Sequence, residues 1–182
     1  MNFEKFPSIK RFKRDIIITE KIDGTNAQVA FDEDLNMFVG SRSRWLSLDE
    51  DNYGFYRWCK EREEELRKLG PGRHFGEFWG QGINRGYDLK DRRFSLFNTT
   101  RWSESSVFPS CCQLVPVLYI GPIDTNVIED ILLELKMYGS GAAPGYNNPE
   151  GIVVYHTTTK ALGKITLGRD GHKWENLNEH TK

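Results

Sequence analysis

Alternating apolar and polar positions along most of the chain predict a protein built mainly from β-strands. Apolar side chains recur at every second position, or in short unbroken runs, in segments separated by Gly, Pro, Asn and Asp. Such segments are typical of half-buried and buried strands. We predict strands over 15–19, 26–31, 36–41, 73–79, 94–98, 114–120, 151–155 and 162–167. We expect the first two strands to pair with each other.

Two segments have a helical period instead. The first helix is predicted over 53–69, with Asn52 as its N-cap and Gly70 at its end. The charged positions 60–65 would form its solvated side, joined by pairs of opposite charge. The second helix is predicted to begin at Asn126 with a capping-box pattern and to end at Gly139. The pattern as a whole predicts an α+β fold with mainly antiparallel sheets and flanking helices.

Composition, charge and cysteine content limit the classes of protein to which this chain can belong. The 182 residues are interpreted as a single domain, 1–182, with the hydrophobic and charged content of a soluble globular protein. A net charge of −1 excludes coating of nucleic acid by bulk charge but permits a local basic groove. Three cysteines, two of them adjacent, indicate reduced thiols in a cytoplasmic protein. We find no signal peptide and no membrane-spanning run.

The clearest candidate for chemistry is the segment from Thr19 to Asn26. It places Lys21, Asp23 and Gly24 in the bend between two predicted strands, at the rim of a sheet. An amine and a carboxylate at such a rim can meet a ligand phosphate, and a lysine attacks covalently once its amine is unprotonated. The alternative interpretation is an ordinary Asp-Gly hairpin turn.

Five further segments follow Lys21 in order. They are Gly40-Ser41-Arg42, the segment from His74 to Gly80 around Glu77, the segment from Phe94 to Asn98 with Phe97, the segment from Pro149 to Tyr155 with Glu150, and the segment from Leu162 to Leu167 with Lys164. In this order the set resembles the motifs of the covalent nucleotidyltransferases, which comprise ATP-dependent DNA and RNA ligases and mRNA-capping guanylyltransferases. The Glu before Lys21 and the Thr-Asn after Gly24 are most similar to the phage-type RNA ligases that seal nicked duplex RNA. The resemblance covers about residues 3–170.

The resemblance implies an ATP-grasp-like nucleotidyltransferase domain that forms a lysine–AMP intermediate and joins 5′-phosphate and 3′-hydroxyl ends. Its cofactors would be ATP and Mg²⁺ or Mn²⁺, and its partner a nucleic acid, RNA in preference to DNA. It implies catalytic roles for Lys21 and Lys164, metal binding by Glu150, and nucleotide contacts by Glu20, Ile22, Asn26, Arg42, Glu77, Phe97 and Glu150. Among these, Glu20 would meet the adenine edge, Glu77 the ribose hydroxyls and Phe97 the adenine face.

Other features of the chain depart from the family or leave alternatives open. Only about fifteen residues follow Leu167, so we expect no C-terminal oligonucleotide-binding barrel, and a partner protein or a dimer could replace it. The glycine-rich run 80–87 is interpreted as a turn that carries Arg85 or Tyr87 towards substrate. The basic segment Lys10 to Arg14 is a solvated turn or a contact to the nucleic-acid backbone or to pyrophosphate. A DNA ligase, a capping-type enzyme and a non-catalytic nucleotide- or end-binding module remain alternative functions.

Overall fold

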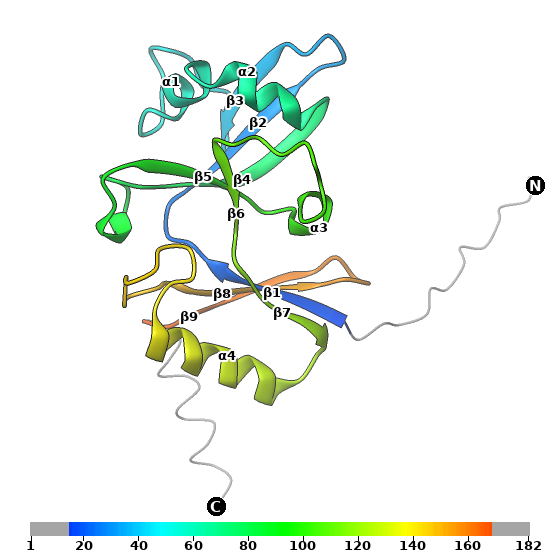
Figure 1. Cartoon of the computed structure of the whole chain (residues 1–182), viewed down its shortest axis with the longest axis vertical. Coiled ribbons are helices and arrows are strands. Elements are labelled where there is room, and N and C mark those ends of the chain that lie inside the picture. Colours follow the sequence, from blue (N-terminus) through cyan, green and yellow to red (C-terminus); the bar gives the residue numbers. More distant parts are fainter. Residues whose placement is uncertain (1–14, 169–182) are drawn as a thin grey trace, which may run out of the picture.

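The computed structural model describes residues 15–168 and contains two β-sheets that lie one above the other (Figure 1). The first sheet has the order β7-β1-β8-β9 and is antiparallel throughout. Its strands are β1 (Asp15–Lys21), β7 (Val117–Pro122), β8 (Gly151–His156) and β9 (Leu162–Thr166). We call it sheet A. Its outer face is covered by helix α4 (Thr125–Tyr138), whose Ile128, Ile131 and Leu135 pack on Ile16, Ile18 and Ile152.

The second sheet, sheet B, has the order β3-β2-β4-β5-β6 and is antiparallel except for the last pair. Its strands are β2 (Thr25–Phe31), β3 (Met37–Ser41), β4 (Gly72–Gly80), β5 (Arg92–Leu96) and β6 (Cys112–Leu114). The short helices α1 (Phe55–Lys60), α2 (Glu63–Leu66) and η1 (Arg67–Leu69) pack on one face of it. The predicted α+β class with mainly antiparallel sheets is therefore confirmed.

The pairing of the first two strands differs from the prediction. β1 belongs to sheet A and β2 to sheet B, so Asp23 and Gly24 connect two sheets and do not close a hairpin. Gly24 fits here because it has no side chain: a Cβ atom would lie 2.4 Å from the carbonyl oxygen of Phe78. The cluster of Ile22, Trp79, Tyr87, Val115 and Ala143 is buried at this junction. The end of β1 is therefore held at the point where the two sheets meet.

The predicted strand 114–120 is also wrong in its extent. The chain leaves sheet B after Leu114 and enters sheet A at Val117, so this segment is two strands. Pro116 lies between them and has no N–H to donate to a strand ladder. Its carbonyl oxygen instead accepts a hydrogen bond from the backbone N–H of Glu20 at 2.9 Å. The crossing strand thus helps to fix the end of β1.

The two predicted helical segments are helical, but not all of the predicted boundaries are right. The helix predicted over 53–69 is divided into α1, α2 and η1, and it begins at Phe55 because Tyr53 and Gly54 have left-handed backbone angles. Helix α4 is capped by Asp124, two residues before the predicted capping residue Asn126, and it ends at Gly139 as predicted. The helices α3 (Thr99–Trp102) and η2 (Gly86–Asp88) were not predicted. Between residues 15 and 168 no helix is both long and apolar enough to span a bilayer.

Candidate active site

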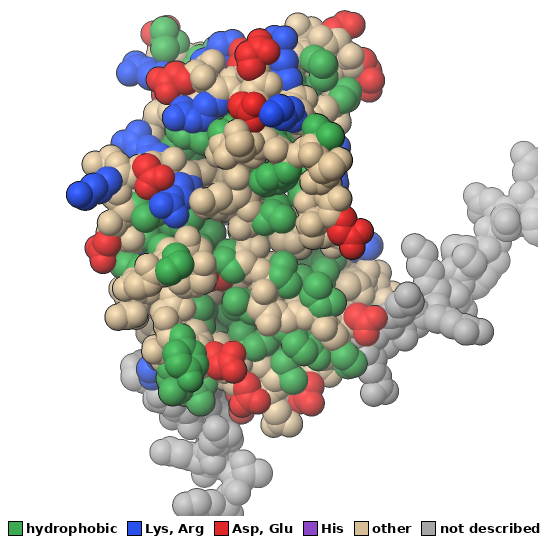
Figure 2. All heavy atoms as spheres, viewed as in Figure 1, with side chains coloured by type: hydrophobic (Ala, Val, Ile, Leu, Met, Phe, Trp, Pro, Cys, Tyr) green, Lys and Arg blue, Asp and Glu red, His purple; other side chains and the backbone are tan. Residues whose placement is uncertain are grey.

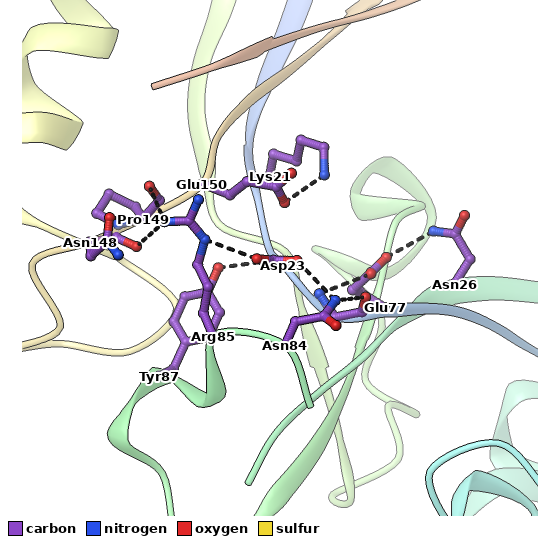
Figure 3. A network of polar contacts seen from close by, with 11 residues as sticks. Lys21, Asp23, Asn26, Glu77, Asn84, Arg85, Tyr87, Asn148, Pro149 and Glu150 are labelled. Atoms are coloured by element: carbon purple, nitrogen blue, oxygen red, sulfur yellow. Dashed lines mark hydrogen bonds and ion pairs between the residues drawn. The ribbon is translucent and has the colours of Figure 1, made fainter. Parts of the chain in front are cut away.

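The candidate nucleophile Lys21 lies at the end of β1, on the face of sheet A opposite to the one that α4 covers. Its Nζ donates to Glu150 Oε2 at 2.5 Å (Figure 3). Glu150 directly precedes β8, and Lys21 is opposite Gly151 in the register of these strands. Strand pairing therefore brings together two residues that are 129 positions apart. Both side chains keep some exposure, 22% for Lys21 and 16% for Glu150, so a ligand can reach them.

A second carboxylate, that of Glu77 on β4, lies beside this pair. Its Oε2 accepts from Asn26 Nδ2 at 2.9 Å and its Oε1 from the backbone N–H of Gly24 at 3.2 Å. Burial raises the pKa of Glu77 to about 7, against the lowering effects of the Asn26 hydrogen bond and of the Lys21 charge. The site thus combines an ion pair with a carboxyl group that changes charge near neutral pH.

The turn after Lys21 is fixed by side chains from the glycine-rich segment that follows β4. Asp23 Oδ1 accepts from Asn84 Nδ2 and Oδ2 from Arg85 Nε, both at 2.9 Å (Figure 3). The backbone N–H of Asp23 donates to Tyr87 Oη at 2.8 Å. Arg85 Nη1 also reaches the carbonyl and side-chain oxygens of Asn148 at 2.9 Å. Arg85 and Tyr87 are therefore engaged with the protein here, and a contact of either residue with substrate stays a prediction.

Three other candidates lie on, or directly after, strands of the two sheets. Lys164 lies on β9 opposite Val153, which is opposite Thr19, so its side chain is on the same face of sheet A as that of Lys21. It is exposed at the edge of the sheet. Arg42 directly follows β3 and is exposed. Phe97 directly follows β5, is 43% exposed, and donates its backbone N–H to Phe75.

Glu20 and Ile22 point away from the face that carries Lys21. Glu20 is 1% exposed; its Oε1 accepts from Ser140 Oγ at 2.5 Å and its Oε2 from the backbone N–H of Ala142 at 3.0 Å. Burial raises its pKa. A contact to the adenine edge would require one of these hydrogen bonds to be exchanged, so it stays a prediction. Ile22 is buried, and only its backbone could touch a nucleotide.

The oxygen donors of the site fit a hard divalent cation. Glu150 supplies carboxylate oxygens, the ligands that Mg²⁺ and Mn²⁺ prefer. Among residues 15–168 there is no group of three or more His, Cys, Asp and Glu side chains placed to hold a metal. The donor set therefore suits an ion that retains several waters and uses ligand phosphates for its remaining contacts. A hollow lined by Tyr87, Leu89 and Tyr146 lies apart from this carboxylate.

Comparison with known proteins identifies the family of this chain and solved structures with the same fold. A family model described as RNA ligase matches residues 14–170, and the chain therefore belongs to the RNA ligase family. No curated protein sequence matches it significantly. Solved structures of a Naegleria gruberi RNA ligase have the same fold at low sequence identity, and the chain spans about half of their length.

Three of these structures show the degree of similarity. A mutant bound to ATP and Mn is 20% identical, with a TM-score of 0.65 over 93% of this chain and 52% of that chain. A mutant in the apo form is 22% identical, with a TM-score of 0.63 over 84% of this chain and 49% of that chain. The ligase with pyrophosphate is 19% identical, with a TM-score of 0.62 over 92% of this chain and 52% of that chain. At these identities the likeness establishes the fold.

Two segments considered in the sequence analysis lie outside the residues that the structure describes. The basic segment from Lys10 to Arg14 and the tail from 169 onward lie outside the range 15–168. Asn84 and Asn148 were missed by the sequence analysis as parts of the site, and Arg85 was named there without its contacts to Asp23 and Asn148. The sequence did contain a signal, because a glycine-rich segment with polar side chains follows a buried strand. It did not show which groups those side chains contact.

Proposed function

We propose that this chain is an ATP-dependent RNA ligase in which Lys21 carries AMP. The observation that carries the proposal is the pair of Lys21 and Glu150 at 2.5 Å, where the chain passes from one sheet to the other, in a chain of the RNA ligase family. The related Naegleria structures with ATP, AMP and Mn support a nucleotide and a divalent metal as ligands here.

In the first step Lys21 Nζ attacks the α-phosphorus of ATP. A P–N bond forms, the bond from that phosphorus to the bridging oxygen breaks, and pyrophosphate leaves while the amine loses a proton to solvent. A lysine held as a cation by Glu150 cannot attack, so nucleotide binding must separate this ion pair. A divalent cation bound by Glu150 would supply charge neutralisation at the phosphates.

The remaining groups would bind and orient the nucleotide. Glu77 and Asn26, already hydrogen-bonded to each other, would meet the ribose hydroxyls, and the exposed Phe97 ring would stack on adenine. Lys164, on the same face as Lys21, would place a compact positive charge at the α-phosphate. Arg42 would contact the phosphate at the 5′ end of the polynucleotide.

Two further transfers complete strand joining. The 5′-phosphate of the polynucleotide attacks the phosphorus of Lys21–AMP, which forms a 5′–5′ pyrophosphate linkage and releases the lysine. A 3′-hydroxyl then attacks the 5′-phosphorus, which makes the phosphodiester and releases AMP. We propose RNA ends as the substrate, in keeping with the family.

The test uses α-³²P-labelled ATP with Mg²⁺ or Mn²⁺, followed by denaturing electrophoresis and by sealing assays on nicked RNA and DNA duplexes and on single strands. We expect a labelled protein band that unlabelled ATP suppresses and GTP does not, and sealing of RNA. Labelling by GTP would favour a capping-type enzyme. ATP binding without a covalent band, and without AMP or pyrophosphate-sensitive material on the isolated protein, would favour a non-catalytic binding module.

A further inference from the structure

A row of side chains crosses sheet B next to the site. Phe97 donates its backbone N–H to the carbonyl of Phe75 at 3.0 Å, Phe75 is opposite Gln28, Gln28 is opposite Gly40, and Gly40 forms a β-bridge with Trp45. Residues that are directly opposite in antiparallel strands have their side chains on one face. We call these five residues the aromatic row. It runs across four of the five strands, from the end of β5 to the segment beyond β3.

The aromatic row lies on the face that holds the candidate active site. Glu77 and Asn26 are opposite each other in the neighbouring row, two residues along β4 and β2 from Phe75 and Gln28. Alternation along a strand puts residues two apart on the same face, about 7 Å from each other. A ligand that extends from the nucleotide site along β4 therefore meets the aromatic row first.

The rings of this region are open to solvent. Phe75 is 51% exposed and Trp45 46%. Phe38 on β3 is also 46% exposed, and its ring centroid is 5.8 Å from that of Trp45. Burying such rings would be favourable, and a group of them on one face indicates a binding surface.

Gly40 allows the Trp45 indole to lie across the sheet. A Cβ atom at position 40 would lie 3.0 Å from Trp45 Cε3 and 2.9 Å from Gln28 Cγ. The backbone N–H of Leu46 donates to the carbonyl of Val39 at 2.8 Å, which fixes the chain that carries the indole. The segment that carries the ring is thus hydrogen-bonded to the edge strand β3.

Arginine side chains lie close to these aromatic rings. The guanidinium of Arg73 on β4 lies 5.4 Å from the centroid of the Trp45 ring. Arg44, in the turn before Trp45, is exposed, as is Arg42. Figure 2 shows that most Lys and Arg side chains on the viewed face gather over the half of the molecule formed by sheet B and its helices. Aromatic rings together with arginines are the combination that binds single-stranded nucleic acid, through base stacking and phosphate contacts.

We propose that Trp45, Phe38 and Phe75 form a stacking platform for unpaired bases of the polynucleotide whose end is joined at Lys21. This inference rests on the proposed function and specifies its substrate class: an end that carries unpaired nucleotides, in preference to a fully paired nick. Phe97 remains with the adenine of ATP, at the other end of the same row. A protein partner would leave the neighbouring arginines without a matching charge unless its own surface were acidic.

The test measures binding of a fluorescent single-stranded RNA with a 5′-phosphate by anisotropy, at fixed salt, with and without the double substitution F38A/W45A. Stacking of one base changes affinity by about 5- to 150-fold, and we expect a loss of about tenfold or more. Tyr138→Ala is the matched control, because Tyr138 is a 75% exposed aromatic side chain on α4. It should bind RNA as the unmodified protein does. Formation of the AMP adduct should be unchanged in all of these proteins.

A second readout does not depend on the double variant being folded. Stacked bases quench tryptophan fluorescence, so RNA should quench the unmodified protein, and Trp45→Phe should lose most of that quenching while it keeps its affinity. RNA binding that is equal in F38A/W45A, or quenching that persists in Trp45→Phe, would overturn the platform and leave the surface for a protein partner. Absence of the AMP adduct in the unmodified protein would instead overturn the proposed function.

Discussion

Arg85 holds Asp23 through a contact of 2.9 Å between Nε and Oδ2, across 62 positions of sequence. The same guanidinium donates to two oxygens of Asn148, two residues before Glu150. Asp23 is two residues after Lys21. Arg85 therefore connects the segment that carries Lys21 with the segment that carries Glu150, the carboxylate partner of Lys21.

Arg85→Ala removes this connection. We expect the free energy of unfolding to fall by about 1–3 kcal/mol, since Asp23 and Asn148 lose charge-assisted hydrogen bonds in a partly buried place. The rate of AMP adduct formation should fall as well, because the ends of β1 and β8 are no longer held together. Denaturant unfolding and a time course of labelling measure the two effects.

The control for this prediction is Arg67→Ala, which removes an arginine that pairs with Glu63 along one helix. It should change stability by no more than about 0.5 kcal/mol and leave the labelling rate unchanged. If Arg85→Ala behaved in the same way as Arg67→Ala, the bracing role of Arg85 would be contradicted.

Glu77→Gln should alter the pH dependence of stability. The pKa of Glu77 is about 7 in the folded protein, against 4.5 for an exposed glutamate. Between these values the folded state binds more protons than the unfolded state, so the free energy of unfolding falls as pH rises. Above about pH 7 this contribution is constant. Glutamine cannot ionise, so the stability of Glu77→Gln lacks this pH-dependent contribution.

The measurement is the difference in unfolding free energy between the unmodified protein and Glu77→Gln. From pH 4.5 to pH 7 we expect the unmodified protein to lose up to about 3 kcal/mol of unfolding free energy relative to Glu77→Gln. Parallel stability curves for the two proteins over that interval would show that Glu77 is not protonated in the folded state at pH 6.

Glu20→Gln separates two roles for the residue before Lys21. Its carboxylate is buried and accepts from Ser140 and Ala142. A structural role alone predicts a change of about 1–3 kcal/mol in stability and no change in the preference for ATP over GTP. Ser140→Ala should reproduce the stability effect. Relaxed discrimination between ATP and GTP in Glu20→Gln, measured by competition for the adduct, would support the adenine contact instead.

Glu150→Gln tests the partner of the nucleophile. The carboxylate lies 2.5 Å from Lys21 Nζ and is the candidate metal ligand, so we expect adduct formation to slow by about 100-fold or more with the fold intact. Asp91→Asn, which removes the carboxylate partner of Arg93 in an exposed pair, is the matched control and should keep the normal rate. An unchanged rate in Glu150→Gln would exclude a role for this carboxylate in the reaction.

Much of this arrangement could be predicted from the sequence because it depends on local pattern. The apolar pattern identified the strands that carry Glu77 and Lys164 and the first strand, which the structure extends to Lys21, and the order of motifs placed Glu150 with Lys21. The sheet to which each strand belongs could not be predicted, since β1 and β2 follow one another closely and yet join different sheets. The break at Pro116 and the contacts of Arg85 depend on residues distant in sequence, and no local pattern contains them.

The central claim is that Lys21 carries AMP, and peptide mapping by mass spectrometry tests it most directly. The protein is incubated with ATP and Mg²⁺, digested, and searched for the mass of AMP, with Lys21→Ala treated in parallel. We predict AMP on the Nζ of Lys21, removed by pyrophosphate, and no adduct in Lys21→Ala. An adduct on another residue, or one that persists in Lys21→Ala, would contradict the assignment.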